Sequence, residues 1–446
     1  MPGAAFSPIL PPMSRPAAHA YPPDLAAHLE GRWRELPPGC PLPPRALLEQ
    51  ILSTAFQASL LRDEERPVTL RLLLTEPEAL PVEGGPPVGL LRIAFDSPRN
   101  FTVDELRRLS PAARYHRSLV GIGATPEGDP CIWGIVQSGP RWLQATRGGR
   151  AASAPLPDLL VIRVTGPGRI FVARGSDTVA GLYGGRLTDG ELDVFESHWL
   201  ASRFTEVRAE VTSLHLAAAR EASHPWGEVD PDLTRMLAQQ MLKRLITTIR
   251  AEHHGGMVVV LPPDCAADLA RGRYLRVKYA CEDGEPRRRY RTLILAVMRV
   301  LGTAAAFWPD AGQAGWSSYR RWNSPDLSTL DEAIFEMATL IGALAGVDGA
   351  VVLTKRFEVM GFGGEIAGDL PEVITVQRAL DLEGTLRETE VVDAMGTRHR
   401  AAYRLCAQFH EAVVIVISQD GGVRFVAWQD GAVTYWDHAS LGSEEA

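Results

Sequence analysis

The chain has few cysteines and lacks the glycine motifs of the common nucleotide-binding folds. Its 446 residues include five cysteines, which are scattered and odd in number and form no CxxC pair. This usage argues against a disulfide framework and against a zinc or redox motif, and it favours a reducing compartment, so we expect a cytoplasmic protein. Neither GxxxxGK[ST] nor GxGxxG occurs, which argues against a P-loop or Rossmann site.

Long apolar runs and an excess of positive charge are also missing. The longest apolar run, residues 293–308, is interrupted by Arg299, and it is shorter than the roughly 20 residues of a membrane-spanning helix. The N-terminal residues lack the basic start and apolar core of a signal peptide. The formal net charge of -8 would repel nucleic-acid backbones and anionic membranes. We therefore expect a soluble protein with neither a nucleic-acid nor a membrane partner.

The composition and length predict two folded domains and a tail. The chain is 46% hydrophobic and 22% charged, as in ordinary folded proteins. Residues 1–44 hold 12 of the 33 prolines, which predicts an N-terminal extension with one short helix near residues 25–36. Mixed periodicity over residues 45–301 predicts a mixed α/β domain. A stretch rich in Trp, Gly, Ser and Arg predicts a linker at residues 302–325, and the second domain follows at 326–440.

Local patterns place individual elements in both domains. Helices are predicted at residues 47–61, 230–252, 326–344 and 398–409. Strands are predicted at residues 68–74, 89–95, 159–164, 169–173, 257–261, 350–353, 413–418 and 423–428. Gly166 and Gly168 stand between two of these strands and predict a tight hairpin. The order of elements predicts an α/β (α+β) fold, in which the C-terminal domain has a central mixed sheet flanked by helices.

The first segment that could carry chemistry is Asp348-Gly349-Ala350. It lies where a long predicted helix gives way to a strand. An acidic side chain at that place lies at a sheet edge, and the small residues after it let a ligand approach the backbone. Taken alone, the tripeptide is better explained as an ordinary turn between a helix and a strand.

The second segment, Gly396-Thr397-Arg398-His399-Arg400, is more unusual. It gathers cationic side chains at the expected first turn of a helix, where the dipole is already positive and acidic residues are normally preferred. Thr397 as N-cap, the backbone N–H groups and the guanidinium groups together predict a phosphate site. The alternative interpretation is a solvated basic turn.

Together the two segments resemble the diadenylate cyclase domain, whose hallmarks are a DGA motif and an RHR motif within GTRHRAA. Residues 396–402 reproduce the second motif in full. The apolar run that ends in Ser418 and is followed by Gly422 is similar to the family's strand that ends in serine. The resemblance covers residues 326–438. It implies that two ATP molecules are condensed into cyclic di-AMP with release of two pyrophosphates, without a covalent intermediate.

The resemblance also implies roles for single residues. Asp348 would bind Mg²⁺ or Mn²⁺ and activate the ribose 3′-hydroxyl, and Asp420 would assist with the metal. Catalytic roles fall to Asp348, Arg398, His399 and Arg400. Contacts to the nucleotide fall to Gly349, Ala350, Leu353, Gly396, Thr397 and Ser418. Because each 3′-hydroxyl must meet the α-phosphate of the other ATP, the resemblance implies a face-to-face homodimer of cyclase domains, or a higher oligomer.

Two features depart from the family pattern. Where family members carry Ser-Glu-Glu, this chain reads Ser418-Gln419-Asp420, so one carboxylate is replaced by an amide. The separation of the two motifs, 398 - 348 = 50 residues, is longer than expected. We place the surplus in the acidic stretch 381–393 and favour a surface loop over a lid. These departures motivate an alternative function, a catalytically silent module that binds ATP or cyclic di-AMP.

Residues 45–301 are similar to the sensor domains, of the DACNV type, that precede some diadenylate cyclase domains. The similarity rests on the layout, on Ile132-Trp133-Gly134-Ile135, and on the helix leading into His254-Gly255-Gly256-Met257. A sensor would change how often two cyclase domains face each other. The alternative is a passive dimerisation scaffold. The pair His253-His254 has no metal ligand at suitable spacing and predicts only the end of the preceding helix.

Overall fold

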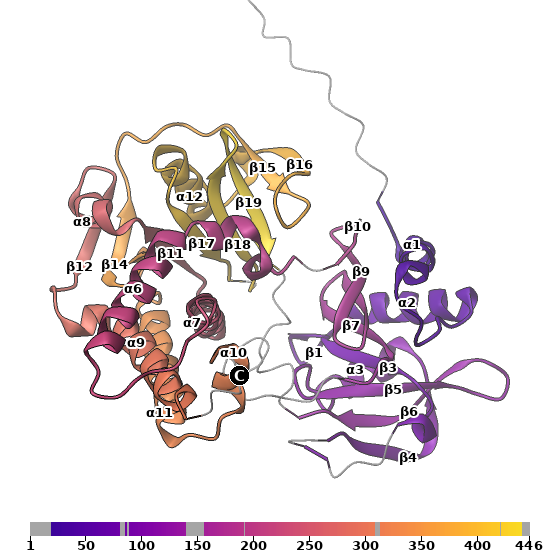
Figure 1. Cartoon of the computed structure of the whole chain (residues 1–446). Coiled ribbons are helices and arrows are strands. Elements are labelled where there is room, and N and C mark those ends of the chain that lie inside the picture. The colour runs from indigo at the N-terminus through magenta and orange to yellow at the C-terminus, as the bar shows by residue number, and fades with distance from the viewer. Residues whose placement is uncertain are drawn as a thin grey trace, which may run out of the picture.

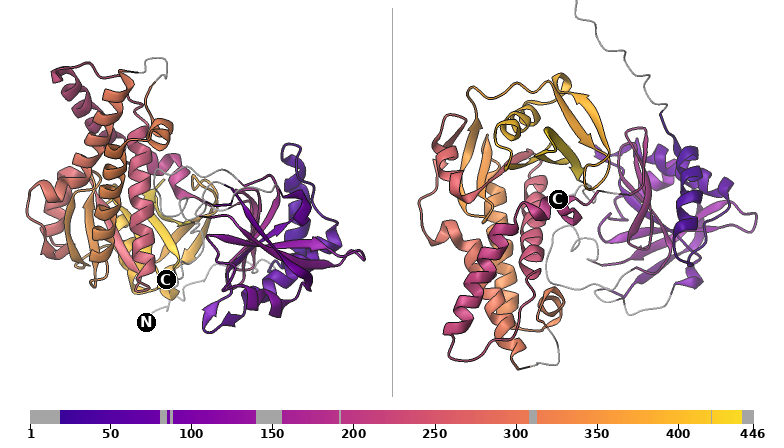
Figure 2. Two further views of the ribbon diagram at one scale, coloured as in Figure 1. Left: turned by 90° about the horizontal axis from the view of Figure 1, so that it is seen from below. Right: turned by 45° about the horizontal axis from the view of Figure 1, so that its top comes forward.

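Two units make up the structure, a computed structural model that describes residues 19–80, 85–86, 89–139, 156–190, 192–307, 313–419 and 421–438. Each unit is built on one large mixed sheet with helices packed against it (Figures 1 and 2). The predicted α/β fold class is therefore confirmed. In the part of the chain that the structure describes, no helix is both long and apolar enough to cross a membrane.

The first unit contains an eight-stranded sheet in the order β10-β9-β8-β7-β3-β5-β6-β4, in which β3 and β5 are parallel. Its strands are β3 (Leu70–Leu74), β4 (Leu91–Asn100), β5 (Ser118–Ala124), β6 (Pro130–Gln137), β7 (Leu160–Gly166), β8 (Arg169–Arg174), β9 (Asp177–Tyr183) and β10 (Arg186–Thr188). Its helices are α1 (Pro22–Glu35), α2 (Arg45–Ser59) and α3 (Val103–Leu109). A separate short ladder joins β1 (Arg62–Asp63) and β2 (Arg66–Pro67).

The local predictions for the first unit agree with its elements. The single helix expected in the proline-rich extension is α1, which has a proline at its start. Proline is favoured there because the first N–H groups of a helix have no partner within it. The buried face of α2, which includes Leu48, Ile51 and Leu52, packs in one apolar cluster with strands of the sheet. The predicted hairpin is β7–β8, with Gly168 at a φ of 67° in the turn.

The second unit contains a nine-stranded sheet in the order β12-β14-β13-β11-β17-β18-β19-β15-β16. Its strands are β11 (Gly256–Leu261), β12 (Leu275–Ala280), β13 (Ala350–Thr354), β14 (Val359–Ile366), β15 (Thr375–Ala379), β16 (Arg387–Val391), β17 (Val413–Ile417), β18 (Val423–Gln429) and β19 (Ala432–His438). Its helices are α5 (His198–Ser202), α6 (Thr205–Glu221), α7 (Leu233–Ala251), α8 (Pro263–Arg271), α9 (Glu285–Ala305), α10 (Trp316–Arg321), α11 (Pro325–Leu344) and α12 (Thr397–Gln408).

Helices cover both faces of this second sheet. Val258 and Val260 of β11 pack in one cluster with α7, α9 and α11. Met257 and Val259, which point to the other face, pack in a second cluster with α8 and α12. A strand that is apolar at every position and buried on both faces belongs in the middle of such a layered sheet. That accounts for the unbroken apolar run of β11.

The predicted division of the chain differs from the division between the two sheets. β11 and β12 lie inside the predicted first domain, yet β11 pairs with β13 and β17 at the centre of the second sheet. The predicted linker, residues 302–325, contains α10. Periodicity identifies residues 257–261 as a buried strand but carries no information about its partners. The predicted boundary consequently falls within the second unit.

The extra residues between the two motifs also form regular secondary structure. Residues 381–393 were expected to form a surface loop, but β16 occupies part of this stretch and pairs antiparallel with β15. β15 in turn pairs with β19, so the hairpin β15–β16 forms one end of the second sheet. The sequence does not reveal this pairing, because four of the five residues of β16 are polar and a strand at a sheet edge need not be apolar.

Candidate functional site

The two sequence motifs meet where the central strands of the second sheet begin or end, on one side of the sheet. We call this side the motif edge. β13 runs parallel to β11, whereas β17 runs antiparallel to it, with Met257 opposite both Ala350 and Val416. The starts of β11 and β13 and the end of β17 therefore lie side by side. The motif edge consists of residues 253–256, 348–350, 417–419 and 421–422 together with Arg250 and the first turn of α12.

The Asp348-Gly349-Ala350 segment presents a carboxylate at this edge. Asp348 follows α11 and has an exposed side chain, whereas Ala350 opens β13 and is buried. Gly349 has a φ of 117°, and a Cβ there would lie 2.7 Å from the carbonyl carbon of Gly363. Because that neighbour is backbone on β14 and cannot swing aside, only glycine fits. The turn that exposes Asp348 thus depends on Gly349.

The RHR motif opens α12, but its cap differs from the prediction. Gly396, not Thr397, is the N-cap, and Thr397 is the first helical residue. The first hydrogen bond of the helix runs from Arg400 N to Gly396 O at 3.2 Å. Glycine fits an N-cap nearly as well as threonine, and the threonine pattern did not reveal this shift. The first turn has no acidic residue, and its N–H groups have no partner within the helix. Those features suit an anion.

Arg398 reaches from α12 to the loop between α7 and β11. Its Nη1 donates a hydrogen bond to the carbonyl oxygen of His254 at 3.2 Å. Gly255 has a φ of 63°, and a Cβ there would lie 2.6 Å from Ile417 O and 3.1 Å from Arg398 Nη1. The loop is therefore wedged between the RHR motif and the end of β17. The sequence prediction assigned this loop to the sensor, although its paired glycines are a signal of close backbone approach.

Ser418 closes a tight turn between β17 and β18. Its backbone N and its Oγ donate to Gly422 O at 2.9 and 3.1 Å, and Gly421 N donates to Ser418 O at 3.0 Å. Arg250 of α7 lies beside this turn, since a Cβ on Gly421 would be 3.3 Å from its Nη2. Arg250 is a further cation of the motif edge that sequence reasoning missed.

One predicted site residue, Leu353, is not brought to the motif edge. Leu353 was expected to contact the nucleotide, but its side chain is fully buried in the apolar cluster beneath α7, α9 and α11. It lies three residues into β13, so the pleat and the length of the strand carry it away from the edge. Asp420, the expected second metal residue, lies outside the described residues.

The charges of the motif edge suit a metal that arrives with phosphate. Asp348 supplies one exposed carboxylate at the motif edge, to which α12 contributes Arg398. Within the described ranges, no three His, Cys, Asp or Glu residues gather as a metal-binding group. Mg²⁺ commonly takes one or two carboxylates and completes its shell with phosphate oxygens and water. Asp348 therefore fits a metal shared with a triphosphate better than one held by the protein alone.

A cleft between the two units borders the motif edge. Gly422 and His438 line it from the second unit, and Arg169 and Tyr183 line it from the first. About 1350 Å³ there is free of protein atoms, including space open to solvent. The Arg169 guanidinium lies 4.5 Å from the centre of the Tyr183 ring. An ion pair between Arg186 of β10 and Glu388 of β16 joins the units beside the cleft.

His438 anchors the segment that enters the second unit. Its Nδ1 accepts a hydrogen bond from Val194 N at 3.2 Å. Burial lowers the pKa of His438 to about 4, against the opposing effect of Asp193, so the imidazole is neutral at neutral pH. Burial alone would raise the pKa of Asp193, but Lys243 and His438 outweigh it and the pKa is lowered.

The comparisons with known proteins bear on the first unit. Residues 38–137 match the family described as "Probable sensor domain DACNV". The match begins shortly before α2 and ends with β6, so β7 to β10 and the whole second unit lie outside it. No curated protein and no solved structure matches the chain. The first unit therefore contains a segment similar to the probable sensor domains of the DACNV family.

Proposed function

We propose that the chain is a diadenylate cyclase, a nucleotidyltransferase that condenses two ATP molecules into cyclic di-AMP and releases two pyrophosphates. The observation that carries this proposal is the shared motif edge. Asp348 and Arg398 come from segments 50 residues apart (398 - 348). Asp348 lies just before β13, whose Ala350 pairs with Met257 at the start of β11, and Arg398 bonds to His254 O in the loop that leads into β11. A separate structural purpose for each motif would not require them to share an edge. The DACNV match is consistent with the proposal, since these sensor domains are associated with diadenylate cyclases.

In the proposed reaction, some residues of the motif edge would bind ATP, and Asp348 would activate its ribose 3′-hydroxyl. The first-turn N–H groups of α12, with Arg398 and Arg400, would hold the triphosphate of ATP. Gly349 and Gly255 would let the nucleotide approach the backbone. Asp348 would orient the ribose 3′-hydroxyl and accept its proton. Mg²⁺ or Mn²⁺ held between Asp348 and the phosphates would supply charge neutralisation.

The reaction requires two copies of the site. Each 3′-hydroxyl must attack the α-phosphate of the other ATP, which is a two-fold symmetric arrangement. Two cyclase domains that meet face to face through identical surfaces would supply it. One copy alone would bind ATP without cyclising it. Homodimerisation, or a higher oligomer, is therefore part of the proposal.

The first unit would regulate this encounter. The cleft lined by Tyr183 and Gly422 places the first sheet next to the turn after Ser418, and Arg186 holds the hairpin β15–β16. A ligand-dependent change in the first unit would alter how freely the motif edge meets a second copy. The probable sensor description of residues 38–137 supports this role.

The proposal is tested by incubating the purified full chain with ATP and either Mg²⁺ or Mn²⁺ and separating the nucleotides by chromatography. We expect cyclic di-AMP with at least one of the two metals. Gln419, which stands where the family carries a carboxylate, favours the second candidate function, a silent module that binds ATP or cyclic di-AMP. Measurable ATP binding without product in either metal would establish that second function instead.

A further inference from the structure

An apolar pocket lies at the opposite edge of the second sheet from the motifs. It is enclosed by α5, α6, α7, α9 and the turn between β13 and β14. About 660 Å³ of space there is free of protein atoms, including the part open to solvent. The innermost walls include the buried side chains of Val211, Leu242, Tyr290 and Ile294. Such a wall offers a site to an alkyl chain and little to a polar molecule.

Phe357, which contributes to the pocket wall, has a backbone conformation that is unfavourable for a bulky residue. It has a φ of 59°, in the left-handed region that a bulky residue rarely adopts. Its amide N donates to Thr354 O at 2.8 Å, which fixes the turn. Its ring is buried and lies 4.8 Å from that of Tyr290 and 6.0 Å from that of Phe204, measured between ring centres. The turn thus adds an aromatic side chain to the wall of the pocket.

The charged residues of the pocket wall are all cationic, and two of them pair with carboxylates outside the lining, Arg235 with Asp232 and Lys355 with Glu411. Five cationic side chains contribute to the lining; they are Arg208, Arg235, Arg291, Lys355 and Arg356. None of the described residues that line the pocket is acidic. An apolar space bordered by cations is complementary to a molecule with an apolar chain and an anionic head.

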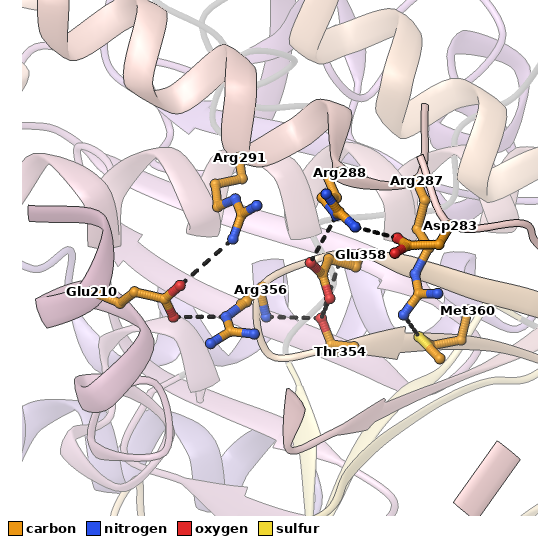
Figure 3. Close-up of polar contacts among 9 residues, drawn as sticks. All are labelled: Glu210, Asp283, Arg287, Arg288, Arg291, Thr354, Arg356, Glu358 and Met360. Atoms are coloured by element: carbon orange, nitrogen blue, oxygen red, sulfur yellow. Dashed lines mark hydrogen bonds and ion pairs between the residues drawn. The ribbon is translucent and has the colours of Figure 1, made fainter. Parts of the chain in front are cut away.

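Two arginines of the pocket wall bind the carboxylate of Glu210. Its Oε2 lies 2.6 Å from Arg356 Nε, and its Oε1 lies 3.5 Å from Arg291 Nη1. Figure 3 shows the carboxylate of Glu210 between these two guanidinium groups. Glu210 belongs to α6, whose buried residues are only Val211 and His215. A carboxylate from outside would therefore compete with a side chain on a helix that is lightly packed.

We propose that this pocket binds a single-chain fatty carboxylate. The alkyl chain would lie among Val211, Ile294 and Phe357, and the carboxylate would replace that of Glu210 on Arg291 and Arg356. The site lies at the end of β13 remote from Asp348, so binding there does not depend on the nucleotide site.

The test is isothermal titration of the full chain with dodecanoate below its micellar concentration. We expect saturable binding with one molecule per chain. Dodecyltrimethylammonium, which has the same chain and the opposite charge, should show no saturable binding. Equal binding of the two amphiphiles would contradict the proposal, because it would show only a general affinity for detergents.

Two tryptophan variants locate the bound chain. Ala238→Trp fills the pocket from α7, whereas Ala217→Trp adds the same ring to the exposed side of α6. Ala238→Trp should abolish dodecanoate binding, and Ala217→Trp should leave it unchanged. Thermal unfolding of both variants shows that the chain is folded. Unchanged binding in folded Ala238→Trp would overturn the assignment of the pocket.

Two charge variants locate the head group and remain informative if the tryptophan variant does not fold. Arg356→Gln should weaken dodecanoate binding about tenfold, because a charge-assisted hydrogen bond is lost. Glu210→Gln should strengthen binding about two- to fivefold, because the competing carboxylate is removed. A merely structural role for this cluster would make both changes act in the same direction, and that result would contradict the proposal.

A vesicle assay separates a free ligand from a membrane surface, which could present the same chemistry. The chain should not sediment with vesicles of phosphatidylglycerol and phosphatidylcholine at concentrations where it binds dodecanoate. Sedimentation with the vesicles and no binding of free dodecanoate would overturn the proposal in favour of a lipid surface.

Discussion

Asp348 is the only carboxylate of the DGA motif, and Gly349 holds it at the sheet edge by a backbone conformation that no other residue fits. In the proposed reaction, Asp348 acts on the 3′-hydroxyl and the metal, and the phosphates are held chiefly by α12. Binding and turnover therefore depend on different residues, and the two variants below separate them.

Asp348→Asn should abolish turnover and leave ATP binding within about threefold of the wild type. The amide keeps the shape of the carboxylate but loses the charge and the ability to accept a proton. Cyclic di-AMP formation is measured by chromatography, and ATP affinity by titration calorimetry. Near-normal product formation by Asp348→Asn would show that this carboxylate has no part in the chemistry.

Arg398→Ala should weaken ATP binding by about tenfold or more, because a cation that faces the phosphates is removed. The matched control is Arg289→Ala, since Arg289 is exposed on α9 and pairs only with Glu285 among the ion pairs of the described residues. The control should bind ATP as the wild type does. Equal ATP affinity in both variants would mean that α12 does not hold the triphosphate.

His438 should make the stability of the fold depend on pH between about 6.5 and 4. Its pKa is about 4 in the folded chain and about 6.5 when unfolded, so the unfolded state binds more protons in this window. The contribution of His438 to the free energy of unfolding is complete above pH 6.5, and it falls by about 3 kcal/mol as the pH reaches 4. Urea unfolding of wild type and His438→Gln across this range should show a smaller loss in the variant. Parallel curves would refute a neutral buried imidazole.

At the residue scale, the sequence identifies candidate site residues only where they belong to a recognisable motif. Asp348, Arg398 and Ser418 belong to the motif patterns, and the structure places them at the motif edge. The paired glycines at 255 and 256 are a signal of close backbone approach, but the sequence does not show what approaches them. The places of Gly255 and Arg250 depend on contacts with segments far along the chain. Leu353 was misplaced for the opposite reason: its neighbours in sequence belong to the site, but the strand carries it into the core.

At the scale of elements, single helices and strands are predictable and their partners are not. The apolar run of β11 and the stripe of α11 are visible in the sequence. β14 is harder to see, because Gly361, Gly363 and Gly364 resemble a bend, yet they lie in a strand where β12 and β13 approach closely. The pairing of β11 with β13 joins residues about 90 positions apart, and no local pattern encodes it.

The sheet order predicts which fragment of the chain folds. Residues 192–446 keep all nine strands of the second sheet and should unfold cooperatively. Residues 326–446 lose β11, α7 and α9, which leaves β13 and β17 without their shared neighbour and removes one apolar layer. We expect that shorter fragment to aggregate or to lack a cooperative transition in thermal unfolding followed by circular dichroism. A stable, cooperatively folding 326–446 fragment would contradict the structure.

At the scale of the whole molecule, the two units meet beside the motif edge, where the proposed regulation would act. The cleft reaches Gly422 at the motif edge, and the ion pair from Arg186 fastens the first sheet to the hairpin β15–β16. This hairpin accounts for part of the extra length between the motifs. The first unit, which contains the sensor-like segment, is therefore joined to the second sheet at the hairpin β15–β16, and the cleft between them extends to Gly422.

The most direct test of the central claim is the stoichiometry of products from the purified full chain supplied with ATP and Mg²⁺ or Mn²⁺. Cyclic di-AMP is measured by chromatography with mass detection, and pyrophosphate by an enzyme-coupled assay. The account predicts two pyrophosphates for each cyclic di-AMP formed. ATP that binds and stays intact, or that is consumed to ADP and phosphate without any dinucleotide, would contradict it.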